Sequence, residues 1–171
     1  ERASPRASRC RANRPQIKLN PLANMPRITP AVFYNDSVAG LEFLGKAFGF
    51  KTRSKYHGPD GQIMHSELEF EDGLIFVGQA CEEQRCSPAN VEGNNTISLY
   101  IYVEDVDAHC ETARAAGAEI TAEPADQFYG DRHYTAKDSE GHLWTFGQHI
   151  RDVAEEECLE LMKQMGGGEE A

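Results

Sequence analysis

An internal duplication constrains the fold of this chain more than any other feature of its sequence. The segment 36–49 begins with Asp36 or Ser37 as a helix cap, carries apolar residues at helical spacing and ends at a glycine. The segment 105–117 repeats this plan. Each segment follows a strand-like run, which is ITPAVFYND in the first copy and TISLYIYVE in the second. The chain therefore contains two copies of a strand followed by a helix.

The segments after the two predicted helices extend the duplication and fix its register. His65 lies eight residues before Gly73, and His133 lies eight residues before Gly141. GLIFVGQ in the first copy then matches GHLWTFGQ in the second with one insertion, at an offset of 68 to 69 residues. We therefore predict an α+β fold of two tandem βαβββ modules, about 26–80 and 95–150, that form a cupped mixed sheet with the helices on its convex side.

Two segments flank the duplicated region. Residues 1–25 hold five Arg, one Lys and one Glu without apolar periodicity, which predicts a disordered leader. This leader is either an extension added upstream of the natural start or the remnant of a targeting segment. In residues 151–171, apolar side chains recur on one helical face opposite acidic ones. We expect an amphipathic helix with a structural role, covering the sheet or docking on a dimer partner, and then a frayed tail.

Charge and composition exclude several kinds of partner. The formal net charge is −11, and because the leader carries +5, residues 26–171 carry −16. An acidic body repels phosphate backbones, so we expect no nucleic acid partner. No run approaches the roughly 18 apolar residues that cross a membrane, so we expect no membrane partner. The five cysteines are too few for a disulfide framework and indicate reduced thiols in a cytoplasmic protein, although Cys81 and Cys86 could form a local disulfide or half of a metal site.

Strand alternation predicts which side chains face the cup. In ISLYIYV the apolar row suits the helix, which turns Tyr100 and Tyr102 toward the cavity. In MHSELEF the apolar residues, Met64 among them, are expected to pack inward. His65 and Glu67 then face the cavity. The predicted cup is therefore lined by aromatic and ionisable side chains.

The twin units resemble a known superfamily. The stretches ITPAVFYNDSVAGLEFLGKAFGF, YVEDVDAHCETARAAGAEI and YGDRHYTAKDSEGHLWTFGQH are similar to those of the vicinal oxygen chelate superfamily, which includes glyoxalase I, bleomycin-resistance proteins and extradiol dioxygenases. The resemblance spans residues 28–149. It implies paired βαβββ modules, commonly in a homodimer, around a cavity that holds a divalent metal in the enzymes. It is specific for the fold, but this superfamily supports many reactions.

The same resemblance implies where metal ligands would stand. The enzymes take ligands from the first and last strands of each module, usually His or Gln from the first and Glu from the last. In this chain the corresponding first-strand positions are Thr29 and Ser98. The last-strand positions are Thr145 and a position near Val77. None of these side chains is an imidazole or a carboxylate, so we expect no metal and no other cofactor.

Two classes of function are compatible with these residues. The first is a metal-independent protein that binds a small cationic or aromatic molecule in the cavity, as the bleomycin-resistance branch does. The expected ligand-binding residues are Phe33, Glu69, Tyr100, Tyr102, Tyr129 and Tyr134. The second is a glyoxalase-like lyase or isomerase, or a related enzyme, that works through a displaced site. Its candidate catalytic residues are His65, Glu67 and His133.

Two plainer interpretations stay open beside these classes. His65, Glu67 and His133 could be the polar lining of a solvated cup, or hydrogen-bond partners that fix the interface between the halves. The whole domain could also be a scaffold with a shrunken cavity.

Overall fold

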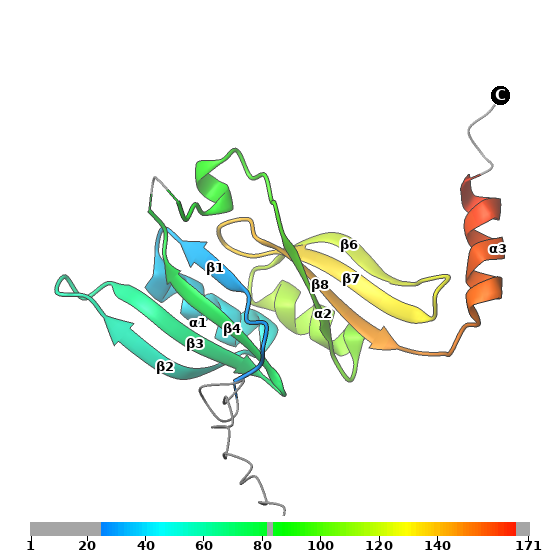
Figure 1. Ribbon diagram of the computed structural model, residues 1–171, viewed down its shortest axis with the longest axis horizontal. Coiled ribbons are helices and arrows are strands. Elements are labelled where there is room, and N and C mark those ends of the chain that lie inside the picture. The colour runs from blue at the N-terminus through cyan, green and yellow to red at the C-terminus, as the bar shows by residue number, and fades with distance from the viewer. Residues whose placement is uncertain (1–24, 82–83, 167–171) are drawn as a thin grey trace, which may run out of the picture.

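The computed structural model describes residues 25–81 and 84–166 (Figure 1). The predicted leader, apart from Met25, and the predicted frayed tail, apart from Gly166, lie outside the described residues. Within the described part of the chain, no helix has the length and apolar character needed to cross a membrane.

The first module contains one helix and one four-stranded mixed sheet. Its sheet has the order β1-β4-β3-β2, with β1 parallel to β4 and the other neighbours antiparallel. The elements, in chain order, are β1 (Ala31–Tyr34), α1 (Ser37–Phe48), β2 (Lys51–His57), β3 (Ile63–Phe70) and β4 (Gly73–Gln79).

The second module repeats this topology after a short 3₁₀ helix, η1 (Pro88–Asn90). Its sheet has the order β5-β8-β7-β6, and β5 is again parallel to β8. The elements are β5 (Ser98–Tyr102), α2 (Val106–Ala115), β6 (Glu119–Asp126), β7 (Asp131–Lys137) and β8 (Leu143–His149), followed by α3 (Glu155–Gly166). The predicted α+β fold of two tandem βαβββ modules is confirmed.

The duplicated capping residues set the ends of both helices. The carboxylate of Asp36 accepts a hydrogen bond from the Ala39 amide at 3.0 Å, and Asp105 caps α2 in the same way through Ala108. Such caps satisfy amide groups that the first helical turn leaves without partners. Gly49 ends α1 in the left-handed conformation, with a φ of 79°.

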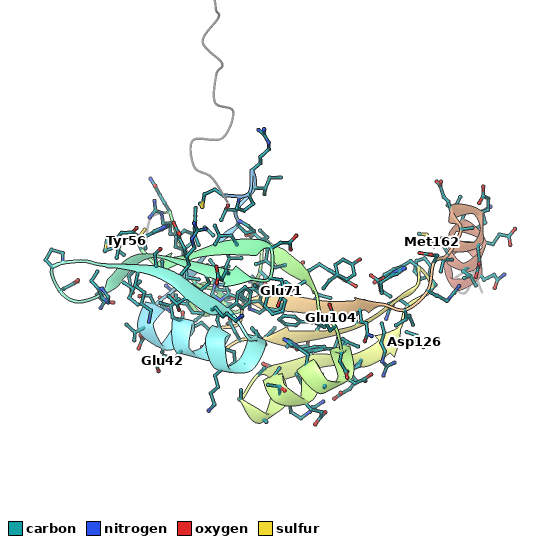
Figure 2. The ribbon with its side chains drawn as sticks, turned by 90° about the horizontal axis from the view of Figure 1, so that it is seen from below. Glu42, Tyr56, Glu71, Glu104, Asp126 and Met162 are labelled. Atoms are coloured by element: carbon teal, nitrogen blue, oxygen red, sulfur yellow. The ribbon has the colours of Figure 1, made fainter. Side chains whose placement is uncertain are left out.

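The two sheets are separate, but the modules share one core. Figure 2 shows α1 and α2 on the same side of the two sheets. The ring of Phe48, at the end of α1, lies 5.6 Å from the ring of Trp144 and 4.8 Å from that of Phe146, both on β8. All three side chains are fully buried. The cup expected from the sequence is thus divided into two four-stranded sheets, held together through their helix-facing sides.

A buried polar cluster also joins the modules. Tyr34 of β1 donates a hydrogen bond to Asp138 Oδ2 at 2.5 Å, and the indole of Trp144 donates to the same oxygen at 3.0 Å. His142 Nδ1 lies 3.2 Å from Asp138 Oδ1. Because both oxygens of Asp138 accept hydrogen bonds, this carboxylate can be buried without an uncompensated charge.

Candidate functional site

Each sheet has one face turned away from the helices, which we call its open face. In the first module, Glu67 on β3 stands opposite Phe76 on β4, and both side chains point to the open face. Leu68 and Val77, one residue further along, are fully buried on the helix side. Met64 was expected to pack inward, but it is 59% exposed, and Ile63 is buried instead. An irregularity in the β2–β3 pairing at Tyr56 and His57 shifts the alternation there.

The open face of the first module brings two of the predicted catalytic residues together. His65 Nε2 lies 4.0 Å from Glu67 Oε1, and Arg53 Nε lies 3.6 Å from Glu67 Oε2. The His65 ring stands edge-on to Phe76, with 4.8 Å between ring centroids. This arrangement is a partly exposed imidazole beside a carboxylate that an arginine also contacts.

Phe33 and Glu69 extend this face on either side. The guanidinium of Arg85 lies over the ring of Phe33, 5.4 Å from its centroid, which is the geometry of a cation–π contact. Glu69 is exposed and pairs across the strands with Lys51. The face therefore offers aromatic rings together with charges of both signs.

The open face of the second module is organised around Asp131. The hydroxyls of Tyr100 and Tyr102 both donate to Asp131 Oδ2 at 2.9 Å, and His149 Nδ1 lies 2.8 Å from Oδ1. Asp131 itself is only 4% exposed. Side chains from β5 and from the end of β8 thus converge on one buried carboxylate at the start of β7.

Protonation within this cluster follows from its contacts. Burial acts to raise the pKa of Asp131, but hydrogen bonds from His149, Tyr100 and Tyr102 outweigh it and hold the pKa below its usual value. Burial and the Asp131 hydrogen bond raise the pKa of Tyr100, and mainly the same hydrogen bond raises that of Tyr102. The phenols therefore stay protonated donors at neutral pH, and Asp131 stays ionised.

The tyrosine rings, in contrast to their hydroxyls, face outward. Tyr100, Tyr102 and Tyr129 are 42%, 60% and 37% exposed. The hydroxyl of Tyr129 is held by His133 Nδ1 at 2.9 Å. Gly147 lies beneath Tyr100, and a Cβ added there would collide with the phenol oxygen. Glycine at this position leaves room for the Tyr100 ring over β8. The rings of Tyr100, Tyr102 and Tyr129 thus form a fixed, accessible wall.

The structure does not gather all of the predicted site residues. Tyr134 is fully buried beneath the sheet against His109 and Phe146, so the prediction that it lines the cavity is wrong. Alternation places it on the opposite side from His133. Within the described residues, no hydrogen bond, ion pair or ring contact joins His133 to His65 or Glu67. The three candidate catalytic residues therefore form two separate groups.

Other contributors to these faces were missed at the sequence level. They are Tyr56, Phe76 and His149. Alternation counted back from His133 places Asp131 on the same face. His149, however, reaches Asp131 only through the β7–β8 pairing.

The positions implied for metal ligands do not fit a divalent metal. Strand pairing places Phe76 opposite Ala31 and Thr145 opposite Tyr100, so Phe76 is the counterpart of Thr145, and Val77 points into the core. Thr29 precedes β1, and Ser98 begins β5. In the described part of the chain, no three His, Cys, Asp or Glu side chains are grouped as a metal site. Hydroxyls and a phenyl ring are poor ligands for divalent transition metals.

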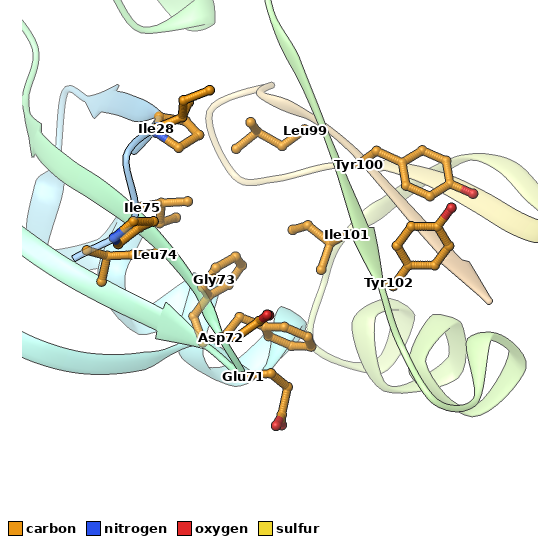
Figure 3. Close-up of a pocket in the computed structure, with 14 residues that line it drawn as sticks. Ile28, Glu71, Asp72, Gly73, Leu74, Ile75, Leu99, Tyr100, Ile101 and Tyr102 are labelled. Atoms are coloured by element: carbon orange, nitrogen blue, oxygen red, sulfur yellow. The ribbon is translucent and has the colours of Figure 1, made fainter. Parts of the chain in front are cut away.

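A separate apolar groove of about 380 Å³ lies between the modules (Figure 3). Ile28, Leu74 and Ile75 line one side, and Leu99 and Ile101 line the other. In Figure 3, Tyr100 and Tyr102 turn away from these two β5 residues. Tyr100 and Tyr102 also line the groove, so the groove adjoins the open face of the second module.

Comparison with known proteins agrees with the fold. The family described as the Glyoxalase/Bleomycin resistance protein/Dioxygenase superfamily matches residues 25–146. An uncharacterised protein of Mycobacterium bovis is 30% identical over 147 residues, which cover 84% of this chain and 96% of that protein.

Solved structures give the same result. TioX from Micromonospora sp. ML1 is 29% identical with a TM-score of 0.60, over 74% of this chain and 100% of that one. TnmS3, an antibiotic binding protein from Streptomyces sp. CB03234, is 17% identical with a TM-score of 0.55, over 70% and 91% of the two chains. The similarity to TnmS3 concerns the fold alone.

Proposed function

Because the chain belongs to the Glyoxalase/Bleomycin resistance protein/Dioxygenase superfamily, we propose that it binds a small cationic or aromatic molecule on its open faces without a protein-bound metal. The observation that carries this proposal is the wall of Tyr100, Tyr102 and Tyr129. Their hydroxyls are held by Asp131 and His133, while their rings remain exposed. Fixed aromatic faces bind planar rings and organic cations at little cost in side-chain entropy.

The charge on these faces favours a cationic ligand. Asp131 stays ionised beneath the tyrosines, and Glu67 and Glu69 stand on the first open face. TnmS3, which has the same fold, is an antibiotic binding protein. This agrees with the proposal but is not its basis.

We also infer a homodimer, in which a second copy closes the open faces into a cavity. A cytoplasmic location is a separate inference, because Cys81, Cys86, Cys110 and Cys158 are free thiols.

Binding of a planar cationic dye, followed by quenching of tyrosine and tryptophan fluorescence, tests the proposal. Tyr102→Leu removes a ring and is expected to weaken binding about tenfold, whereas Tyr102→Phe keeps the ring and is expected to change binding about twofold or less. Tyr134→Phe, in the core, is the matched control and should leave binding unchanged. Equal effects of the Leu and Phe variants would contradict a role for the ring face.

Metal independence needs its own measurement. Calorimetric titration with Zn²⁺, Ni²⁺ and Fe²⁺, together with elemental analysis of the purified protein, is expected to show no stoichiometric metal. Tight binding of one metal per chain would overturn this part of the proposal.

The enzyme alternative is favoured by one observation, the contact between His65 and Glu67. It predicts turnover of a hemithioacetal or similar substrate that is lost in His65→Ala. Turnover that persists in this variant would exclude a site built on His65.

A further inference from the structure

The C-terminal helix α3 has an exposed apolar face that its own chain leaves uncovered. Figure 1 shows α3 clear of both sheets. Leu159 and Met162 on this helix are 49% and 54% exposed. A helix of 12 residues is marginal in water without tertiary packing, so we expect α3 to have a packing partner.

The sheet beside α3 is unsuited to that role. The first turn of α3 carries Glu155, Glu156 and Glu157. The outer strand of the adjacent module, β6, carries Glu119, Glu123 and Asp126 and no basic residue. Arg114 and Arg132 already pair with Glu123 and Asp126, and Glu119 carries the same sign of charge as the acidic turn. Like charges repel, which favours a partner surface of opposite sign. The same repulsion disfavours pairing of two α3 helices through their acidic ends.

A basic surface of the required kind lies on the outer strand of the first module. The strand β2 has the sequence KTRSKYH, with three basic residues and no acidic one. Lys51 pairs across the strands with Glu69, and Tyr56 pairs with His65, so both point to the open face. Tyr56 is 59% exposed. Arg53 contacts Glu67, and Lys55 pairs with Ser66 on the helix side. The positive charge beside the exposed Tyr56 on the open face therefore comes from Lys51 and Arg53.

One chain cannot bring its own α3 onto its own β2. Figure 1 shows the two elements at opposite ends of the molecule. The amides of Ile150 and Arg151 are bound to the Gly130 carbonyl, which leaves residues 152–154 to span at most about 10 Å. The first sheet alone is about 14 Å wide. A β2 strand that contacts α3 therefore belongs to another molecule.

We propose that α3 of one copy packs along β2 on the open face of a second copy. The spacings agree with this placement. Glu155 and Met162 are about 10 Å apart along a helix, and Arg53 and Tyr56 are about 10 Å apart along a strand. Glu155 then lies beside the basic end of β2 while Met162 covers Tyr56. This contact does not require a bound ligand, and it specifies which surfaces of the two copies meet.

Charge exchange in the full chain tests the contact. Analytical ultracentrifugation measures the dissociation constant of the dimer for each variant. Lys51→Glu and Glu155→Lys are each expected to weaken the dimer about tenfold, and the double variant is expected to restore it. Glu156→Lys is the matched control, because it makes the same change in the same turn but on the side of the helix away from the apolar face. Its dissociation constant should stay within about twofold of the wild-type value.

Several outcomes would overturn the proposal. These are a wild-type protein that stays monomeric, equal weakening by Glu155→Lys and Glu156→Lys, and a double variant that does not recover. Recovery of Lys51→Glu by Glu119→Lys would also overturn it, because β2 would then pair with β6 of the second copy.

Cross-linking gives a readout that does not depend on charge. Isotope-labelled and unlabelled copies of Tyr56→Cys, whose introduced thiol lies on the open face, are mixed and treated with a short thiol cross-linker. We expect a link between Cys158 of one copy and the introduced thiol of the other. Lys46→Cys, on α1 away from the open face, should give none. Absence of the first link, or equal yields from both variants, would overturn the contact.

Discussion

At the scale of single residues, Asp131 determines how the second open face can be used. A carboxylate with one oxygen bound to two phenols and the other to an imidazole has little capacity left for a ligand. Its role is to hold the rings of Tyr100 and Tyr102 in place. A ligand therefore contacts the ring faces of Tyr100 and Tyr102, and the negative charge of Asp131 lies behind these rings.

The first prediction concerns the removal of that charge. Asp131→Asn keeps the shape of the side chain but weakens the acceptor for both phenols, so we expect the free energy of unfolding to fall by about 1–3 kcal/mol. Asp107→Asn is the matched control, because Asp107 pairs with Arg132 at the surface, and the loss of such an exposed pair should cost clearly less than Asp131→Asn. Urea denaturation measures both changes. Equal losses in the two variants would contradict the organising role of Asp131.

At the scale of elements, strand alternation is the part of the site that the sequence predicts well. It places Tyr100, His65 and Glu67 on the open faces. It fails locally where the strand pairing shifts, as at Met64. The one-residue insertion between the copies obscures that Phe76, not Val77, matches Thr145. Pairing irregularities depend on contacts between strands, which a single sequence does not display.

The turn before β8 gives a second prediction, because it caps a helix in the other module. The Glu140 carboxylate accepts from the amides of Asn35 and Asp36 at 2.8 and 2.9 Å, and from the Ser87 hydroxyl. Glu140→Gln removes the charge that these donors and the α1 dipole favour, so we expect a loss of about 1–2 kcal/mol. Thermal unfolding measures it.

The duplication supplies the control for this prediction. Glu71 occupies the corresponding turn of the first module, and in the described residues no hydrogen bond reaches its carboxylate. Glu71→Gln should therefore leave the melting temperature within about 1–2 °C of the wild-type value. A melting temperature lowered as much by Glu71→Gln as by Glu140→Gln would show that the capping contact is not what stabilises the protein.

At the scale of the whole molecule, the two modules depend on one shared core, which the sequence does not reveal. The duplication predicts two similar units, but it does not show which side chains join them. His109 of α2 illustrates this. Its Nε2 donates to the Phe48 carbonyl at the end of α1, and its Nδ1 accepts from the Tyr134 hydroxyl. Contacts across 61 and 25 residues depend on packing that local patterns do not encode.

His109 makes stability depend on pH in a defined direction. Burial lowers its pKa, although the hydrogen bond to Phe48 acts the other way. The unfolded chain therefore binds the proton more readily. The contribution of His109 to stability is full above about pH 6.5 and is lost as the pH falls. We expect His109→Gln to reduce the loss of unfolding free energy between pH 7 and pH 5, measured by urea denaturation.

His149 provides a control of opposite sign. Its hydrogen bonds to Asp131 and Asp152 raise its pKa, so its contribution is present at low pH and is lost as the pH rises through the folded-state value. His149→Gln should therefore steepen the loss below pH 7. The same change of slope in both variants would contradict the assignment.

The shared core also predicts that the two modules unfold together. Trp144 is the only tryptophan, and it contacts Phe48 and Phe50 of the other module, so its fluorescence reports their docking. We expect the fluorescence and circular dichroism transitions to coincide in urea. Phe48→Ala should shift both by about 3–5 kcal/mol, while Phe33→Ala, half-buried on the open face, should cost less than half as much. If fluorescence in Phe48→Ala changes well before the dichroism, the modules separate before they unfold and the core does not act as one unit.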